Sequence, residues 1–280
     1  MHLKLTLNNA GYCLAKASHA IKGAPTKNIA FGALFGLIQH PKLGYILFDT
    51  GYTQRFFEAT KNFPNKIYAM ATQVMAAPQT EVRNQIATLG IHCSDIKHVI
   101  LSHFHADHIA GLKDFENATI HCSKTAYEQA KNIPSFLGFT KGILKPLLPK
   151  NLSSRVQFIE NSGGLPDELF GKKYDIFGDG SIMAVPLPGH AAGQMGIQLS
   201  TQKNHYFLVA DACWDQRAYK NLDFPNAIVR LFFDSWAQYK QTIFQLHKYH
   251  TQHPKTIIVP THCAQTTELL IQNNLNLDVL

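Results

Sequence analysis

Short apolar runs separated by polar stretches recur along the whole chain, and their spacing predicts both strands and helices. Apolar residues with little polar interruption indicate strands, whereas spacing of three and four residues indicates helices. Expected strands cover 2–7, 44–48, 96–101, 119–122, 156–159, 181–185, 196–199, 206–210 and 256–259. Expected helices cover 54–75 with a break near Pro64, 80–89 with Thr80 as N-cap and Gly90 as stop, a segment after Ser123, and 233–249. Strands that alternate with helices in both halves predict an α/β protein layered around a central sheet.

Two segments match neither the strand pattern nor the helix spacing. The stretch 133–149, IPSFLGFTKGILKPLLP, is apolar but interrupted by Gly and Pro, and we interpret 133–150 as a lid or substrate loop. An ordinary core-packing loop or a dimer contact is an equally good interpretation. The stretch 31–36, FGALFG, has the same two interpretations, and its glycines favour a mobile loop or hairpin near the site.

The strand expected at 96–101 runs into LSHFHADHIAG, which places His103, His105, Asp107 and His108 within six positions. A loop can fold back so that near neighbours face one point. Neutral imidazole and carboxylate suit zinc, with iron, manganese or cobalt as alternatives. The chain has 15 histidines, so a histidine-rich surface loop is the competing interpretation.

Other expected strands also end in candidate ligands. The segment Leu187-Pro188-Gly189-His190 follows one strand, Asp211 ends another, and His262 follows the last. α/β proteins gather their sites at the carboxyl ends of strands. Each of these residues alone is unremarkable, but together with the 103–108 cluster they indicate a metal site.

Composition narrows the class of protein. Lys and Arg outnumber Asp and Glu by 26 to 19, which gives a net charge of +7 in 280 residues. No dense basic run occurs, so this charge favours general solubility and we expect no nucleic acid partner. The five cysteines are scattered, odd in number and form no CxxC, which indicates reduced thiols and a cytoplasmic location. We expect neither a signal peptide nor a membrane span, because no sufficiently long apolar stretch is present.

The combination of motifs resembles the metallo-β-lactamase superfamily. HFHADH is similar to its HxHxDH signature, and PGH, Asp211 and His262 follow in the superfamily's order. Asp49-Thr50-Gly51 resembles its early strand-end motif. The resemblance implies one domain over 1–280 with an αββα sandwich fold, two packed mixed sheets flanked by helices. It also implies two divalent ions, with zinc expected: the first bound by His103, His105 and His190, the second by Asp107, His108 and His262, and Asp211 bridging both.

The resemblance further implies hydrolysis by a metal-bridging hydroxide, with Asp107 carrying a proton to the leaving group. An Asp at position 211 favours lactonases, thioesterases and phosphodiesterases over zinc β-lactamases. Cys213 lacks a histidine base, so we interpret it as a small core residue. Among the remaining histidines, His121 is the best candidate for a group that supports the ligands from behind.

Within the superfamily, the chain is most similar to the N-acyl-homoserine lactonases, whose ring-opening reaction is called quorum quenching. Phe136 and Phe139 are the expected contacts for the acyl chain. Trp214 occupies the position at which several lactonases have a tyrosine that contacts the substrate carbonyl. The pattern PGHTxGH is altered to 188–194, PGHAAGQ, which removes a histidine that is not a metal ligand.

Alternatives remain open. A glyoxalase II-like thioesterase would use the same metals, with Lys141, Lys145 and Lys150 as the best candidates for a basic binding cluster. A phosphodiesterase would exploit the positive charge, although the large extra domain of RNA-processing members is missing. A non-catalytic ligand-binding protein is a third class, which the full ligand set disfavours. The expected partner is a small acylated molecule, and a homodimer is left open.

Overall fold

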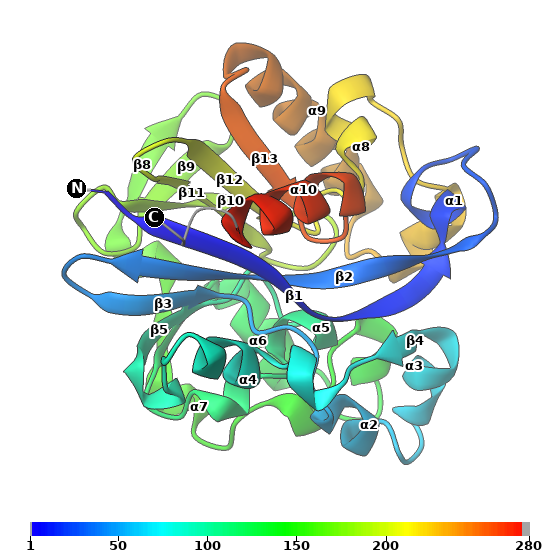
Figure 1. Cartoon of the computed structure of the whole chain (residues 1–280). Helices are drawn as coiled ribbons and strands as arrows, with labels where there is room; N and C mark the ends of the chain where they lie inside the picture. Colours follow the sequence, from blue (N-terminus) through cyan, green and yellow to red (C-terminus); the bar gives the residue numbers. More distant parts are fainter. Residues whose placement is uncertain (1, 276–280) are drawn as a thin grey trace.

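Two β-sheets lie face to face in the computed structural model, which describes residues 2–275 (Figure 1). Pairing in both sheets is mixed: β3, β5, β6 and β7 run parallel to one another, as do β12 and β13, and the remaining neighbours are antiparallel. The first sheet has the order β4 (Gln73–Met75), β1 (Lys4–Lys16), β2 (Asn28–His40), β3 (Gly44–Phe48), β5 (Ile96–Ile100), β6 (Thr119–Cys122), β7 (Val156–Phe158). The second has the order β13 (Thr256–Pro260), β12 (His205–Ala210), β11 (Met195–Ser200), β10 (Ile182–Pro186), β9 (Gly171–Asp175), β8 (Gly164–Asp167).

Helices cover the outer faces of both sheets. On the first sheet lie α4 (Val82–Thr88), α5 (Ala106–Ile109), α6 (Lys124–Asn132) and α7 (Leu152–Arg155), and on the second lie α8 (Gln216–Asn221) and α9 (Trp236–Gln252). The helix α10 (Ala264–Leu275) contacts β1, β2 and β13. The short helices α1 (Ala17–Ala20), α2 (Arg55–Ala59) and α3 (Lys66–Ala71) complete the α-helices. Short 3₁₀ helices occupy Pro78–Thr80, Cys93–Asp95, Leu112–Asp114, Gly138–Lys141, Lys145–Leu147, Ile159–Ser162 and Ala227–Phe232.

The side-chain alternation of β5 shows how the layers are built. Val99 and Leu101 pack among the helices on the outer face of the first sheet, whereas Ile100 packs between the two sheets. Ile38 and Leu208 meet Ile100 in this inter-sheet layer, and all three are buried. Strands with both faces buried are expected to read as continuous apolar runs. The αββα sandwich implied by the sequence resemblance is confirmed.

Of the two interpretations of 31–36, the mobile loop is wrong, whereas the alternative, a hairpin near the site, agrees with the structure: Phe31 packs against His262. These residues lie inside β2, paired on one side with β1 and on the other with β3. Gly32 is needed for close packing, because a Cβ there would lie 2.6 Å from Asn9 Oδ1. A glycine in a strand can mark such an approach as well as a loop.

Other boundaries differ locally. The strand expected at 2–7 is the start of β1, which continues to Lys16. Its neighbour β4 pairs with it at the edge of the sheet, at Tyr12–Leu14. The helical segment 54–75 is broken as expected, but 73–75 form β4. Helix α4 begins after Glu81 instead of Thr80, while Gly90 ends it with a left-handed φ of 73°. The hairpin β8–β9, helix α8 and helix α10 were not expected. Within the described residues, no helix has the length and apolar character needed to cross a membrane.

Candidate metal centre

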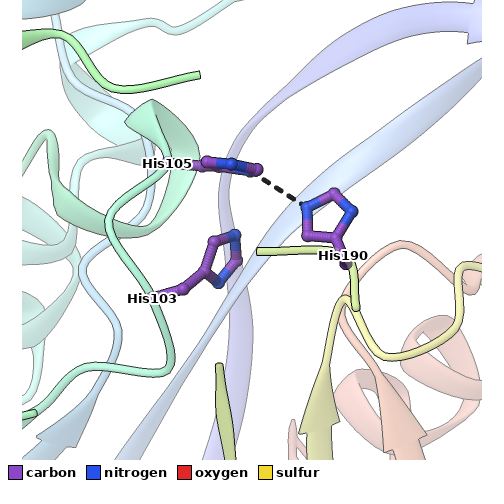
Figure 2. Close-up of side chains that lie close together, drawn as sticks. All are labelled: His103, His105 and His190. Carbon is purple, nitrogen blue, oxygen red and sulfur yellow. Dashed lines mark hydrogen bonds between the residues drawn. The ribbon is translucent and has the colours of Figure 1, made fainter. Parts of the chain in front are cut away.

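The three histidines of the first ligand group come from two loops that meet at one edge of the sheets. His103 and His105 follow β5, and His190 follows β10. Figure 2 shows the three rings facing one another. Their centroids lie 4.4 Å apart for His103 and His105, 4.7 Å for His105 and His190, and 5.2 Å for His103 and His190. The ligand nitrogens all lie within 4.8 Å of one another, so they can share one ion.

A second group lies beside the first. It consists of Asp107 and His108 on α5, Asp211 after β12 and His262 after β13. His108 Nε2 is 3.4 Å from Asp107 Oδ2 and 3.3 Å from Asp211 Oδ1. His262 Nε2 is 3.0 Å from Asp211 Oδ2, and the same oxygen is 3.3 Å from His190 Nε2 of the first group. Asp211 therefore joins the two groups, as a bridging carboxylate must.

These distances fit metal ions. Two atoms that each lie about 2.0–2.1 Å from a tetrahedral zinc ion lie roughly 3.3 Å from each other. His103 Nε2, His108 Nε2 and Asp211 Oδ1 are buried and have no hydrogen-bond partner among the described residues. Buried polar atoms are normally paired, so these atoms need another partner. Two divalent ions would supply it, and the donor set of imidazole and carboxylate suits them.

Burial prepares the first group for a cation. It lowers the pKa of His105 to about 4 and that of His190 to about 3, and it holds the pKa of His103 well below its usual value. All three rings are therefore neutral at pH 7. A neutral imidazole is the form that binds a metal.

The second group is electrostatically different. Burial raises the pKa of Asp107, but His108 and His262 overcome this effect and bring it to about 2. Burial also lowers the pKa of His262, yet the nearby carboxylates of Asp211 and Asp107 raise it overall. Both carboxylates are thus ionised at neutral pH and attract positive charge, which a divalent ion would carry.

Asp49, at the end of β3, holds His108 from behind. His108 Nδ1 donates to Asp49 Oδ2 over 2.7 Å, and Ser102 donates to the same carboxylate from its backbone N–H and its hydroxyl. Burial lowers the pKa of His108 but the surrounding carboxylates raise it overall, and once its Nε2 proton is displaced by a metal ion, this hydrogen bond keeps the remaining proton on Nδ1. The motif Asp49-Thr50-Gly51 was part of the sequence resemblance, but we had assigned Asp49 no role. A supporting role for Asp49 could have been inferred from its place at the end of a strand, since the ends of parallel strands lie at one edge of the sheet.

His121 does not take the supporting role that we expected. Its Nε2 lies 3.1 Å from His98 Nδ1, and its ring packs against Phe177. Neither partner is a candidate ligand. His262 is also supported from behind, since its Nδ1 donates to the carbonyl of Gly32 over 2.8 Å, and His103 Nδ1 lies 3.0 Å from Ser102 Oγ. Cys213 is buried in the core, as the sequence indicated.

The segment 133–150 reaches the centre through Gly142. This residue has a left-handed φ of 69°, and a Cβ there would lie 2.7 Å from His105 Cδ2. Its carbonyl accepts the backbone N–H of Ala106 over 3.2 Å. Opposite, the backbone N–H of Asp234 donates to the carbonyl of His190 over 3.1 Å, and Lys141 Nζ lies 3.9 Å from Asp234 Oδ1.

The predicted substrate contacts lie in three settings. Phe136 is 63% exposed, and Phe139 is partly buried against the outer core of the first sheet. Trp214 lies at the centre itself, where its Nε1 donates to Asp211 Oδ2 over 3.2 Å. Phe31, which belongs to the segment 31–36 that the sequence indicates near the site, packs beside His262 with ring centroids 5.5 Å apart. Phe233, which sequence reasoning missed, packs beside His190 with ring centroids 5.1 Å apart, and no local motif marks it.

Comparison with known proteins agrees with this geometry. The metallo-beta-lactamase superfamily model matches residues 30–245. The N-acyl homoserine lactonase AttM of Agrobacterium fabrum is 28% identical over 80% of this chain and 79% of its own length. AttM of Azorhizobium caulinodans is 30% identical over 66% of this chain and 68% of its own.

Solved structures share the fold. An N-acyl homoserine lactone hydrolase with the product N-hexanoyl-L-homoserine at its catalytic metal centre has a TM-score of 0.73 at 19% identity, covering 96% of this chain and 97% of its own. The dizinc quorum-quenching lactonase AidC has a TM-score of 0.65 at 18% identity, covering 95% and 89%. With the family model matching most of the chain and the ligands assembled as two groups, this protein is a metal-dependent hydrolase that belongs to the metallo-beta-lactamase superfamily.

Proposed function

We propose that this protein is a dizinc lactonase that opens the ring of N-acyl homoserine lactones, a quorum-quenching activity. The observation that carries the proposal is the pair of ligand groups joined by Asp211. The named activity of the AttM relatives, which align with most of this chain, supports the choice of substrate. Zinc is the proposed metal because histidine and carboxylate ligands at tetrahedral spacing suit it.

Two bound divalent ions would activate water at neutral pH and polarise the substrate carbonyl. The residues around them supply position and proton transfer. Asp107 is an ionised, nearly buried carboxylate, 7% exposed, so it can accept the proton that the attacking water loses. Returning that proton to the ring oxygen helps an alkoxide to leave, which is the harder part of lactone opening. We propose Asp107 as this proton carrier.

The acyl chain is proposed to lie along the segment 133–150. Gly142 brings this segment against His105, and the 3₁₀ turn Gly138–Lys141 packs against α3. Phe136 and Phe139 are therefore our proposed acyl contacts, with the segment acting as a lid. The high exposure of Phe136 suits a side chain that becomes covered only when an acyl chain is present.

The thioesterase alternative is less well supported. The three lysines considered for a basic cluster have other partners or none nearby: Lys141 lies beside Asp234, Lys145 donates to the carbonyl of Lys131 over 2.7 Å, and Lys150 is exposed. A phosphodiesterase would use the same metals, and the net charge of +7 is what favours it.

The experiment that tests the proposal is a comparison of substrates with metal-replete enzyme. N-Acyl homoserine lactones, matched acyl thioesters and bis-p-nitrophenyl phosphate are offered, and the acyl-homoserine product is identified by mass spectrometry. We expect kcat/KM for lactones to exceed that for thioesters by at least about tenfold, and Asp107→Asn to reduce kcat on lactones more than on thioesters, because a thiolate needs less protonation. A preference for thioesters or the phosphodiester would overturn the lactonase assignment.

Location and assembly are further parts of the proposal. The five cysteines form no disulfide, in keeping with a reducing cytoplasm. Exposed apolar side chains gather on and near α2 and α3, at Phe57, Phe63, Ile67 and Met70, and support a homodimer through this face. Analytical ultracentrifugation of the wild type and of Met70→Glu tests it; a monomeric wild type at micromolar concentration would contradict it.

A further inference from the structure

The indole of Trp214 meets the candidate metal centre at a single atom. Its Nε1 donates to Asp211 Oδ2, and that oxygen also lies 3.3 Å from His190 Nε2 and 3.0 Å from His262 Nε2. Oδ2 is therefore the point at which the two ligand groups meet. Among the described residues, Trp214 is the one side-chain donor to Asp211 that is not itself a candidate metal ligand.

Neighbouring rings hold the indole in this orientation. Phe31 and Phe233 pack edge-on against it, with centroids 6.1 Å and 5.1 Å away at interplanar angles of 90° and 88°. Both phenylalanines are buried, each 4% exposed. They come from β2 and from the loop before α9, so the indole is held from two sides by separate parts of the fold. A ring packed in this way cannot swing outward without displacing buried neighbours.

The hydrogen bond from Trp214 restricts the orientation of the Asp211 carboxylate. Its carboxylate must present Oδ1 toward His108, 3.3 Å away, and Oδ2 toward both His190 and His262. Rotation about the terminal side-chain bond would exchange or misplace these oxygens, and this bond is intrinsically soft. A fixed N–H aimed at Oδ2 selects one orientation before any ion binds.

We infer that Trp214 is a positioning residue, whose indole N–H orients the Asp211 carboxylate so that it can serve both ligand groups. The inference rests on the dinuclear metal centre of the proposed function and not on its lactone substrate. An indole has one N–H and no acceptor. Because that one N–H is committed to Asp211, the indole has no second donor to offer elsewhere in the centre.

The test is metal affinity, measured by competition between metal-free protein and a chromophoric zinc chelator. Trp214→Phe keeps an aromatic ring and removes the N–H. Loss of a group that supports a ligand from behind weakens metal binding about 10- to 100-fold. Since Asp211 serves both groups, we expect both ions to bind more weakly, by at least about tenfold. Trp214→Gln, which restores an N–H donor without adding an imidazole ligand, should recover part of the loss.

The matched control is Trp236→Phe, since Trp236 stacks on Tyr239 and packs against Phe233 without touching Asp211. It should bind both ions with wild-type affinity. The visible absorption of cobalt-loaded protein gives an independent readout, expected to change in Trp214→Phe and not in the control. Thermal unfolding of the metal-free variants separates a folding defect from a binding defect, and Trp214→Leu, which is also apolar and lacks the N–H, carries the test if the Phe variant does not fold.

The outcomes separate this inference from the proposed function. Two ions bound by Trp214→Phe with unchanged affinity would overturn the positioning role and leave the metal centre intact. Fewer than two ions in the wild type would overturn the centre, and the inference with it. Loss of one ion alone in Trp214→Phe would also contradict the inference, because it would place the role of the indole in a single ligand group.

Discussion

His108 donates a hydrogen bond from Nδ1 to Asp49 Oδ2 over 2.7 Å, although 59 positions separate the two residues. Both side chains are fully buried. The bond exists because β3 and β5 are parallel neighbours, so their carboxyl ends lie side by side and the loop after β5 meets the residue that ends β3. It leaves His108 Nε2, which has no protein hydrogen-bond partner among the described residues, turned toward the second ligand group.

Asp49→Asn should therefore weaken the binding of the second metal ion, the one held by Asp107, His108 and His262, more than that of the first. An amide accepts from His108 more weakly than a carboxylate does, so we expect about 10- to 100-fold lower affinity at the second site and little change at the first. Chelator competition on metal-free protein measures both. Asp114→Asn is the control, because that carboxylate pairs with Arg55 away from the centre. Equal loss of both ions in Asp49→Asn would contradict the selective role.

Gly142→Ala should weaken the binding of the first metal ion, the one held by His103, His105 and His190. The new Cβ would lie 2.7 Å from the ring of His105, in a left-handed conformation that costs roughly 1–2 kcal/mol for other residues. Gly90→Ala is a matched control, since Gly90 has a similar φ of 73° but no atom within 4 Å of the added carbon. Both variants should lose the stability that the left-handed φ costs, and Gly142→Ala should lose more because of its contact with His105, but only Gly142→Ala should lose affinity for the first ion. An unchanged metal content in Gly142→Ala would show that the segment does not press on His105.

The candidate ligands could be predicted from sequence, whereas their supports could not. His103, His105, Asp107 and His108 lie in one short motif, and the others follow strands, so local pattern and strand order were sufficient. Phe233 reaches the centre only through long-range packing, and no spacing rule marks it, whereas the glycines around Phe31 did indicate a segment near the site. The strand β2 was not predicted because glycines usually indicate turns. Here Gly32 lies within a strand and makes room for the side chain of Asn9.

Phe139→Ala should raise KM more for long-chain than for short-chain lactones. Burying a methylene is worth about 0.8 kcal/mol, so lost contact with two or more methylenes should produce at least a tenfold difference. Phe136→Ala tests the outer part of the same segment. Phe244→Ala on α9, where the side chain is also exposed, is the control. An equal rise in KM at every chain length would favour a packing role for the segment.

Acid should destabilise the protein partly through His121. Burial and the neighbouring His98 lower the pKa of His121 to about 4. In the unfolded chain this histidine binds a proton near pH 6.5, whereas in the folded protein it does so only near pH 4. Between these values protonation favours the unfolded state, so the free energy of unfolding falls as the pH falls from 6.5 to 4. The loss amounts to about 3 kcal/mol at pH 4 for this one group.

Urea unfolding at several pH values tests this contribution. His121→Gln should unfold with a flatter pH dependence than the wild type between pH 6.5 and pH 4. His205→Gln, a substitution of an exposed histidine, should follow the wild-type curve. Identical slopes for the wild type and His121→Gln would show that other groups account for the acid sensitivity.

The central claim is that lactone opening depends on two ions held by two ligand groups that share Asp211. The most direct test is the initial rate of N-acyl homoserine lactone hydrolysis by metal-free protein, measured as zinc is added in fractions of an equivalent. We predict no significant rate without metal and a rise that ends in a break at two equivalents per chain. A rate that saturates at one equivalent, or no lactone opening after two ions are bound, would contradict the account.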